Sequence, residues 1–242
     1  MVLSVGTVLV IIGAGLAVGI SALGAGIGVG IAGAAAAGVT AVDQDKFGVA
    51  LVFQALPQTQ GIYGLLIAIL LLMSTGVLGG GSADVPVSVG LTALGVGIAV
   101  GLSGLSAIGQ GIAASSGVAV AGRDSEAVGK GLVFSVLPET QAIYGLLVAI
   151  LLMAFTGMFT GVYTLPAAVG FAAIGSGIAI GFAGLSGIGQ GITAGAGIVA
   201  TARNPDVMGR ALIFAVMSET FAIFGLLIAI LIMFGIGLFG GA

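Results

Sequence analysis

The chain consists largely of apolar segments that are longer than a lipid bilayer requires. Of its 242 residues, 59% are hydrophobic and only 5% are charged, so too few polar side chains remain to cover a soluble globule of this size. A membrane-spanning helix needs roughly 20 apolar residues, and these segments exceed that length. The sequence therefore predicts an all-α integral membrane protein.

The chain also repeats itself roughly every 80 residues, and each repeat is long enough for one helical hairpin. Phe53, Phe134 and Phe214 occupy equivalent places in the three repeats. We expect six transmembrane helices in three tandem hairpins that pack side by side. The hairpins are expected at 1–81, 82–162 and 163–242, and their helices at roughly 3–40, 48–77, 86–121, 128–160, 166–202 and 207–238.

The two helices of each hairpin differ in composition. The first is dense in Gly, Ala and Ser, as in 24–30 and 184–191, whereas the second carries bulky Leu, Ile, Phe and Met side chains. Small residues let membrane helices approach closely. We therefore expect a tight inner layer of the first helices and an outer layer of the second helices that faces lipid.

All basic residues fall in three short stretches, in or beside the connection between the two helices of each hairpin. An excess of Lys and Arg on one side marks the cytoplasmic side of a membrane protein. These loops are therefore expected to be cytoplasmic, with both termini outside. We expect the membrane to be the plasma membrane of a prokaryote. The five basic residues are Lys46, Arg123, Lys130, Arg203 and Arg210.

Two acidic residues, Glu139 and Glu219, lie inside the apolar segments. Glu139 follows Lys130 by nine residues, or roughly 14 Å of helix, which places it near the middle of the bilayer. An ionisable group at that depth costs about 3 kcal/mol or more and is a functional candidate by default. The alternative is a protonated acid with a packing role, but both acids recur with the same Gln and Thr neighbours.

A glutamine occurs among glycines in the first helix of two hairpins, at Gln110 and Gln190. A buried amide is costly unless it finds partners, and the carboxylate of the same hairpin is the obvious one. An interhelical packing bond is the alternative. Pairing of each amide with Glu139 or Glu219 predicts two sites that bind an ion within the membrane.

The run Leu-Pro-Glu-Thr-Gln-Ala-Ile-Tyr-Gly at 137–145, together with the intramembrane glutamines, resembles the proteolipid (c or K subunit) of V-type and A-type rotary ATPases. The resemblance covers essentially the whole chain. It implies a homo-oligomeric rotor ring in which each carboxylate carries one Na⁺ or H⁺, with no catalytic residues and no cofactor in this chain. It also implies contacts with a static a/I subunit, which supplies half-channels and an Arg, with the central stalk at the cytoplasmic loops, and with lipid, but none with nucleic acid.

The resemblance further implies which residues hold the ion, because the site of sodium-binding members forms between neighbouring hairpins. A proton needs only the carboxylate, so the surplus of oxygen ligands favours Na⁺ over H⁺. Thr59 and Thr140 have an alternative role as hydrogen-bond donors to their own helix. Tyr63 and Tyr144 would either donate to the carboxylates or pack. The first implied set is Leu56, Thr59, Gln60, Gln110 and Glu139, and the second is Leu137, Thr140, Gln141, Gln190 and Glu219.

A third set would join hairpin 3 of one chain to hairpin 1 of the next, but three of its ligands are replaced. Phe221 stands where the other two hairpins have Gln60 and Gln141. Val29 stands at the position of Gln110 and Gln190, and Gln58 stands at the position of Glu139 and Glu219. We expect this site to be vacant, which gives two ions per three hairpins. A stand-alone transporter and a structural membrane ring without ATP coupling are the competing functions.

Overall fold

The computed structural model describes residues 3–79 and 84–240, and every regular element within these ranges is a helix. Five of the described helical stretches are long and apolar enough to cross a membrane, and Gln44–Ala55 with Gln58–Ser74 makes a sixth span bent by 42°. The all-α prediction with six spans is confirmed. The expected boundary between the first two hairpins, at 81/82, lies outside the described residues.

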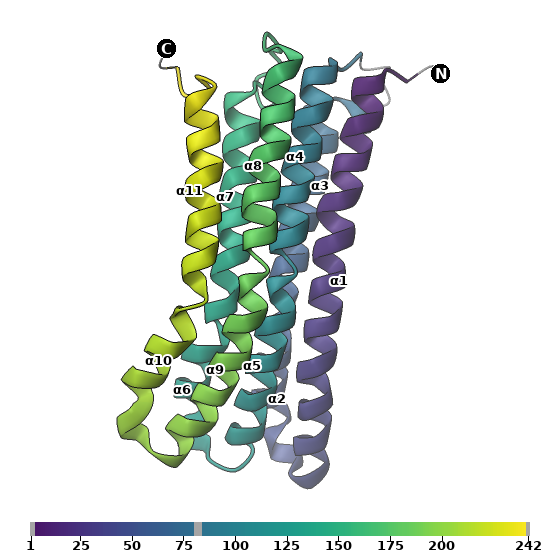
Figure 1. The fold of residues 1–242 in the computed structure, drawn as a ribbon. Helices are drawn as coiled ribbons and strands as arrows, with labels where there is room; N and C mark the ends of the chain where they lie inside the picture. The colour runs from purple at the N-terminus through teal and green to yellow at the C-terminus, as the bar shows by residue number, and fades with distance from the viewer. Residues whose placement is uncertain (1–2, 80–83, 241–242) are drawn as a thin grey trace.

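Each hairpin runs along the bundle and returns (Figure 1). The beginning of α1 and the end of α11 lie at one end, and the turns within the hairpins lie at the other. The first hairpin contains α1 (Val5–Val42), α2 (Phe47–Ala55) and α3 (Gln58–Ser74). The second contains α4 (Val87–Ser103), α5 (Ser106–Ala121), α6 (Val128–Ser135) and α7 (Thr140–Phe155). The third contains α8 (Ala167–Ala183), α9 (Ser186–Arg203), α10 (Met208–Val216) and α11 (Glu219–Gly235).

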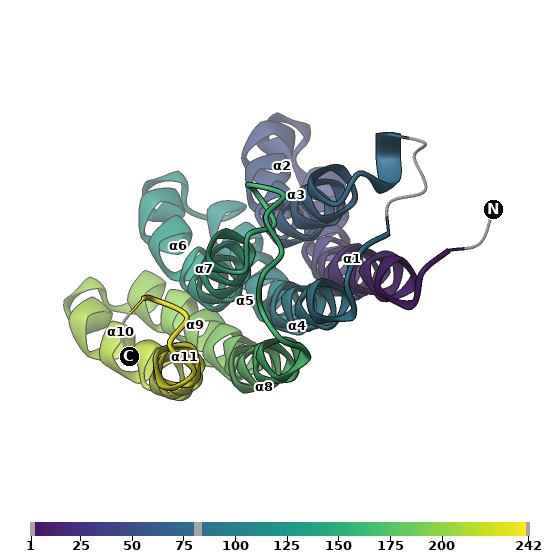
Figure 2. The ribbon, with the colours of Figure 1, turned by 90° about the horizontal axis from the view of Figure 1, so that it is seen from above.

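The helices form two curved rows, as expected from their composition. Figure 2 shows α1, α4 and α8 in one row and α3, α7 and α11 in the other. The inner row is closely packed: a Cβ added to Gly24 of α1 would lie 2.7 Å from the carbonyl oxygen of Gly104. Small residues therefore set the spacing between neighbouring hairpins.

All three outer spans are interrupted at the same level. The first two interruptions fall at Pro57 and Pro138, where proline lacks the N–H needed to continue the helix, but the third falls at Met217 and Ser218, where there is no proline. The interruption is thus a property of the repeat and does not require the ring of proline. The carbonyl oxygen of Phe53, just before the first interruption, accepts a hydrogen bond from Leu56 N at 3.3 Å, so the turn tightens locally to the 3₁₀ pattern.

The inner spans of the second and third hairpins are also interrupted, which the residue pattern did not predict. The breaks follow Ser103 and Ala183, at Gly104 and Gly184, whereas α1 runs unbroken through the equivalent Leu23. Glycine costs about 1 kcal/mol relative to alanine in a helix. The chain at Gly104 uses shorter-range bonds, with Ala107 N donating to its carbonyl at 3.1 Å.

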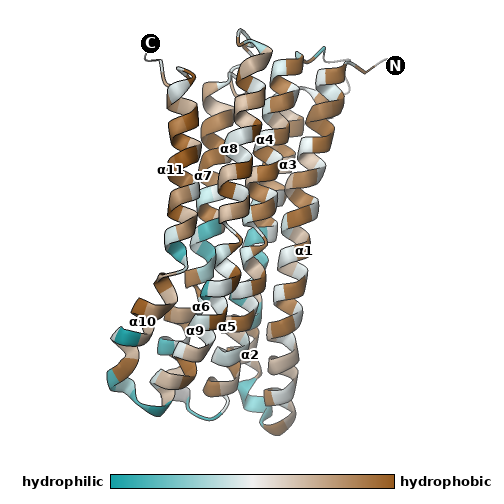
Figure 3. Ribbon diagram, in the orientation of Figure 1, coloured by the Kyte–Doolittle hydropathy of each residue, from teal (hydrophilic) through white to brown (hydrophobic). Residues whose placement is uncertain are grey.

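Polar residues occupy two levels of the bundle. Figure 3 shows them at the hairpin turns and again at the level of the helix interruptions, while the remaining surface is apolar. The second level lies within the spans, where water cannot satisfy polar groups. Its side chains must therefore satisfy one another or hold a ligand.

Candidate functional site

Glu139 lies at the interruption between α6 and α7, at the end of the 3₁₀ segment Leu137–Glu139. Its side chain is half-buried. The Tyr63 hydroxyl of hairpin 1 donates to its Oε1 at 2.6 Å, and Gln110 Nε2 of α5 donates to its Oε2 at 3.3 Å. Both carboxyl oxygens therefore accept a hydrogen bond from a neighbouring side chain.

The hydrogen-bond network continues from Gln110 into the first hairpin. Gln60 Nε2 donates to Gln110 Oε1 at 2.7 Å, and both side chains are fully buried. The Thr59 hydroxyl lies 3.0 Å from Gln60 Oε1 and 3.0 Å from the Leu56 carbonyl oxygen. All five residues of the first expected set therefore belong to one connected network between hairpins 1 and 2.

The second expected set forms the same network between hairpins 2 and 3. Tyr144 donates to Glu219 Oε1 at 2.7 Å, and Gln190 Nε2 donates to Oε2 at 3.2 Å. Gln141 Nε2 donates to Gln190 Oε1 at 2.7 Å. Thr140 Oγ1 completes the network, at 3.3 Å from Gln141 Oε1 and 3.0 Å from the Leu137 carbonyl oxygen.

The networks bear on the alternative roles that the sequence left open for the threonines and for Gln110. Thr59 and Thr140 do bond to their own helices, but each also reaches the adjacent glutamine. Gln110 bonds to the carboxylate of its own hairpin, as expected, and also to Gln60 of the preceding one. The amide is thus shared across the hairpin interface.

The two tyrosines were left outside the expected ligand sets, although their hydroxyls touch the carboxylates directly. A signal was present in the sequence. Tyr63 and Tyr144 recur at equivalent positions, and the third repeat carries Phe224 there, in the same hairpin that carries Phe221 in place of a glutamine. The loss of both polar groups together indicates that they belong to one site.

The third expected set is not brought together within one chain. Val29 and Gln58 lie in the first hairpin, and Phe221 lies in the third, which is at the other end of the row (Figure 2). Phe221 is 62% exposed and packs edge-on against Phe224, with ring centroids 6.2 Å apart. Gln58 is likewise exposed, whereas Val29 is half-buried, so the three residues are divided between the two free edges of the molecule.

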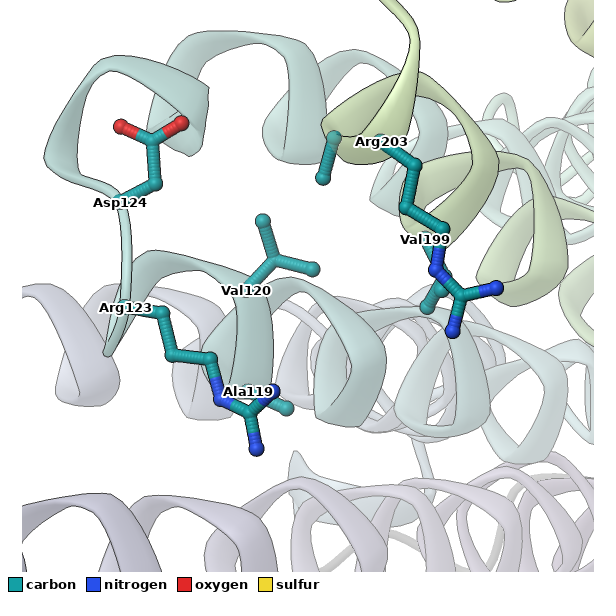
Figure 4. Close-up of a pocket in the computed structure, with 7 residues that line it drawn as sticks. Ala119, Val120, Arg123, Asp124, Val199 and Arg203 are labelled. Atoms are coloured by element: carbon teal, nitrogen blue, oxygen red, sulfur yellow. The ribbon is translucent and has the colours of Figure 1, made fainter.

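A separate cavity of about 360 Å³ lies near the hairpin turns, between the ends of α5 and α9 (Figure 4). Arg123, Arg203 and Asp124 line it together with apolar side chains such as Val120. None of the residues that line it belongs to either carboxylate network. The cavity therefore belongs to the loop end of the bundle.

Comparison with known proteins identifies the family of the chain. The family model for the ATP synthase C subunit matches three times, at residues 12–71, 94–152 and 174–232. The A-type ATP synthase subunit K of Methanocaldococcus jannaschii is 60% identical over 222 residues, which cover 92% of this chain and 94% of that protein. The V-type sodium ATPase subunit K of Enterococcus hirae is 38% identical over 120 residues, covering 49% of this chain and 73% of that protein. The c subunit of the V-type proton ATPase of Candida tropicalis is 31% identical over 104 residues, covering 43% and 62%. The chain therefore belongs to the ATP synthase C subunit family and is a non-catalytic, multi-pass proteolipid subunit of an A/V-type ATP synthase.

Proposed function

We propose that copies of this chain form the membrane rotor ring of the synthase and carry Na⁺ at Glu139 and Glu219. The observation that supports this most directly is the repeated network. At two hairpin interfaces, the same residue types connect to a carboxylate inside the apolar span. A packing role would not require the same hydroxyl, amide and carboxylate groups at both places.

The charge of the carboxylate supports a cation as the missing partner. Both oxygens of Glu139 already accept hydrogen bonds, and every Lys and Arg of the chain lies in or near a hairpin turn, away from the carboxylates. A bare carboxylate within the membrane is costly unless it is paired or neutralised. A bound cation would neutralise it while the site faces lipid.

The other ligands favour Na⁺ over H⁺. Thr59 Oγ1, Gln60 Oε1 and the Leu56 carbonyl oxygen lie close together, and oxygens of this kind coordinate Na⁺ in membrane proteins. A proton would need only the carboxylate. The similarity to the sodium ATPase subunit of Enterococcus hirae agrees with Na⁺.

The third interface is proposed to carry no ion, so that each chain carries two ions for three hairpins. With the number of hairpins in the ring fixed, fewer ions move per ATP, and each ion receives more of the free energy of ATP hydrolysis. Such a ring would suit transport against a steep gradient. A measured ratio of one ion per hairpin would contradict the proposal.

In the proposed cycle, an ion enters through a half-channel of the static a/I subunit and displaces the Arg of that subunit from Glu139 or Glu219. The neutral, loaded site then moves into lipid and releases its ion at the second half-channel. The hairpin turns would be cytoplasmic and contact the central stalk, with both termini outside a prokaryotic plasma membrane. Excess Lys and Arg at the turns supports this orientation.

Carbodiimide labelling of the purified protein tests the choice of ion. Labelling is followed at constant pH and ionic strength in NaCl or in KCl, with modification located by mass spectrometry of peptides. We expect modification at Glu139 and Glu219 and slower labelling of both in NaCl. Equal rates in the two salts would show that protons are the transported ion.

A further inference from the structure

One phenylalanine of the repeat is exposed where its two counterparts are buried. Phe53 and Phe134 are fully buried, whereas Phe214 of the third hairpin is 63% exposed. Phe53 lies against Gly117 of the next hairpin, and Phe134 lies against Gly197. Each buried ring thus fastens the outer helix of one hairpin to the inner helix of the following one.

A groove at the opposite edge of the chain corresponds to the surroundings of Phe53. It has a volume of about 310 Å³ and lies between α1 and α2 in the first hairpin. Phe53 packs in a cluster with Ala114, Val118 and Ala121 of α5. The repeat places Gly33, Ala37 and Thr40 of α1 at these three positions, and all three line the groove.

We propose that Phe214 of one copy inserts into this α1–α2 groove of a second copy and so fastens neighbouring chains. This inference rests on the proposed ring and names the contact that holds it together. Because the contact joins the last hairpin of one chain to the first hairpin of the next, it is heterologous and closes into a ring when the angle between copies allows it.

The α1–α2 groove differs in detail from the surroundings of Phe53 and Phe134. Ala36 stands where Gly117 and Gly197 stand in the other hairpins, and a Cβ on Gly197 would lie 2.7 Å from Cε1 of Phe134. One turn earlier, Gly33 stands where the second hairpin has Ala114, so a methyl group is missing there. The side chain of Gln54 occupies the space that this methyl group would take. The incoming ring is therefore displaced toward Gly33, and the long, flexible Gln54 side chain adjusts to it.

The stretches around the turns of the first and third hairpins carry opposite net charges. The turn of the first hairpin has two acidic residues, Asp43 and Asp45, and one basic residue, Lys46. The corresponding stretch of the third hairpin has two basic residues, Arg203 and Arg210, and one acidic residue, Asp206. Arg210 is exposed and lines the free edge of hairpin 3 together with Phe214. Opposite net charges on the first and third hairpins favour head-to-tail association.

Two variants with matched controls test the contact. Phe214→Ala removes the inserted ring, and Ala37→Trp fills the groove at a side chain that is exposed in the single chain. Phe159→Ala and Ala119→Trp make the same changes at exposed residues of the second hairpin, which already has a neighbour on both sides. Purified complexes are analysed by native mass spectrometry, with helicity checked by circular dichroism.

We expect both edge variants to lose most of the assembled species to single chains and both controls to remain assembled. Because both carboxylate networks lie within one chain, protection of Glu139 by Na⁺ should survive in the dissociated variants, which separates this test from that of the transported ion. Assembly that persists in either edge variant, or that is lost equally in the controls, overturns the proposal.

Discussion

The first and third hairpins have each lost one half of an ion site and kept the other half. Hairpin 1 retains Thr59, Gln60 and Tyr63, which face hairpin 2, but carries Val29 and Gln58 at its free edge. Hairpin 3 retains Gln190 and Glu219 in the second network but carries Phe221 and Phe224 at its free edge. The losses therefore fall at the two free edges of the chain, which the proposed ring brings together.

The free edges of hairpins 1 and 3 have kept the residues that pack neighbouring hairpins together. Phe214 is retained in the third hairpin, and the α1–α2 groove is present in the first. The repeat thus separates into two levels, one that holds the hairpins together and one that holds an ion. At the proposed contact between chains, the ion level has lost its polar groups, whereas the packing level differs only in small residues such as Gly33 and Ala36. The two tasks are therefore carried by different residues.

The largest expected effect is at the carboxylate itself. Glu139→Gln would give hairpin 2 the residue that hairpin 1 carries at Gln58, and the longest gap between carboxylates around the ring would grow from two hairpins to three. We expect ATP-driven ion transport in proteoliposomes to fall to background, although Glu219 is intact.

Gln58→Ala is the matched control for that change and should leave transport unaltered, because Gln58 is exposed and lies outside both networks. Half-maximal transport by Glu139→Gln would show that each carboxylate works independently of its neighbours, contrary to a rotary mechanism.

A smaller loss is expected at the shared amide. Gln110→Leu removes a donor to Glu139 and leaves the Gln60 amide without its acceptor. Hydrogen bonds to charged groups contribute about 1.5–3 kcal/mol, so the Na⁺ concentration that half-protects Glu139 from carbodiimide should rise about 10- to 100-fold. Val29→Leu, at the equivalent position of hairpin 1, should change nothing. A rise as large in Val29→Leu would contradict the assignment of the third site as vacant.

A smaller change still is expected at the tyrosine. Tyr63→Phe removes one hydroxyl and copies the native Phe224, so packing is preserved. The loss of one hydrogen bond to the carboxylate, about 1.5 kcal/mol, weakens Na⁺ protection of Glu139 about tenfold, at the lower end of the range for Gln110→Leu, which disturbs two bonds. Protection of Glu219 should be unchanged, because Tyr144 serves that site. Equal weakening at both carboxylates would indicate a general loosening of the bundle.

The sequence predicted those features that depend on repeat alignment. The pairing of Gln110 with Glu139 followed from the three aligned repeats, because a buried amide and a buried acid in one hairpin have few other partners. The bond from Gln60 to Gln110 and the hydroxyl of Tyr63 on Glu139 depend on how neighbouring hairpins are aligned along the membrane. That alignment is set by close packing of the inner helices and cannot be read from spacing within one hairpin.

The helix interruptions show a second limit. Glycine in these inner helices serves close packing at most positions, so its composition alone did not distinguish Gly104 and Gly184, where the helix breaks, from Gly24, where it continues. The break at Ser218 likewise lacks the proline that marks its two counterparts. In both cases the repeat itself, compared between hairpins, carries more information than any single residue.

The smallest expected effect tests whether the continuity of α1 matters to the ion sites. Leu23→Gly would give α1 the residue found at Gly104 and Gly184, and Leu23→Ala removes the same side chain while keeping a strong helix former. The two variants should differ by about 1 kcal/mol in stability, seen as a small drop in the dissociation temperature of the complex. Na⁺ protection of Glu139 should be equal in both, because hairpin 1 contributes to that site from α3 and from the turn before it. A specific loss of protection in Leu23→Gly would mean that the unbroken inner helix positions the first site, and the two levels of the repeat would then be coupled.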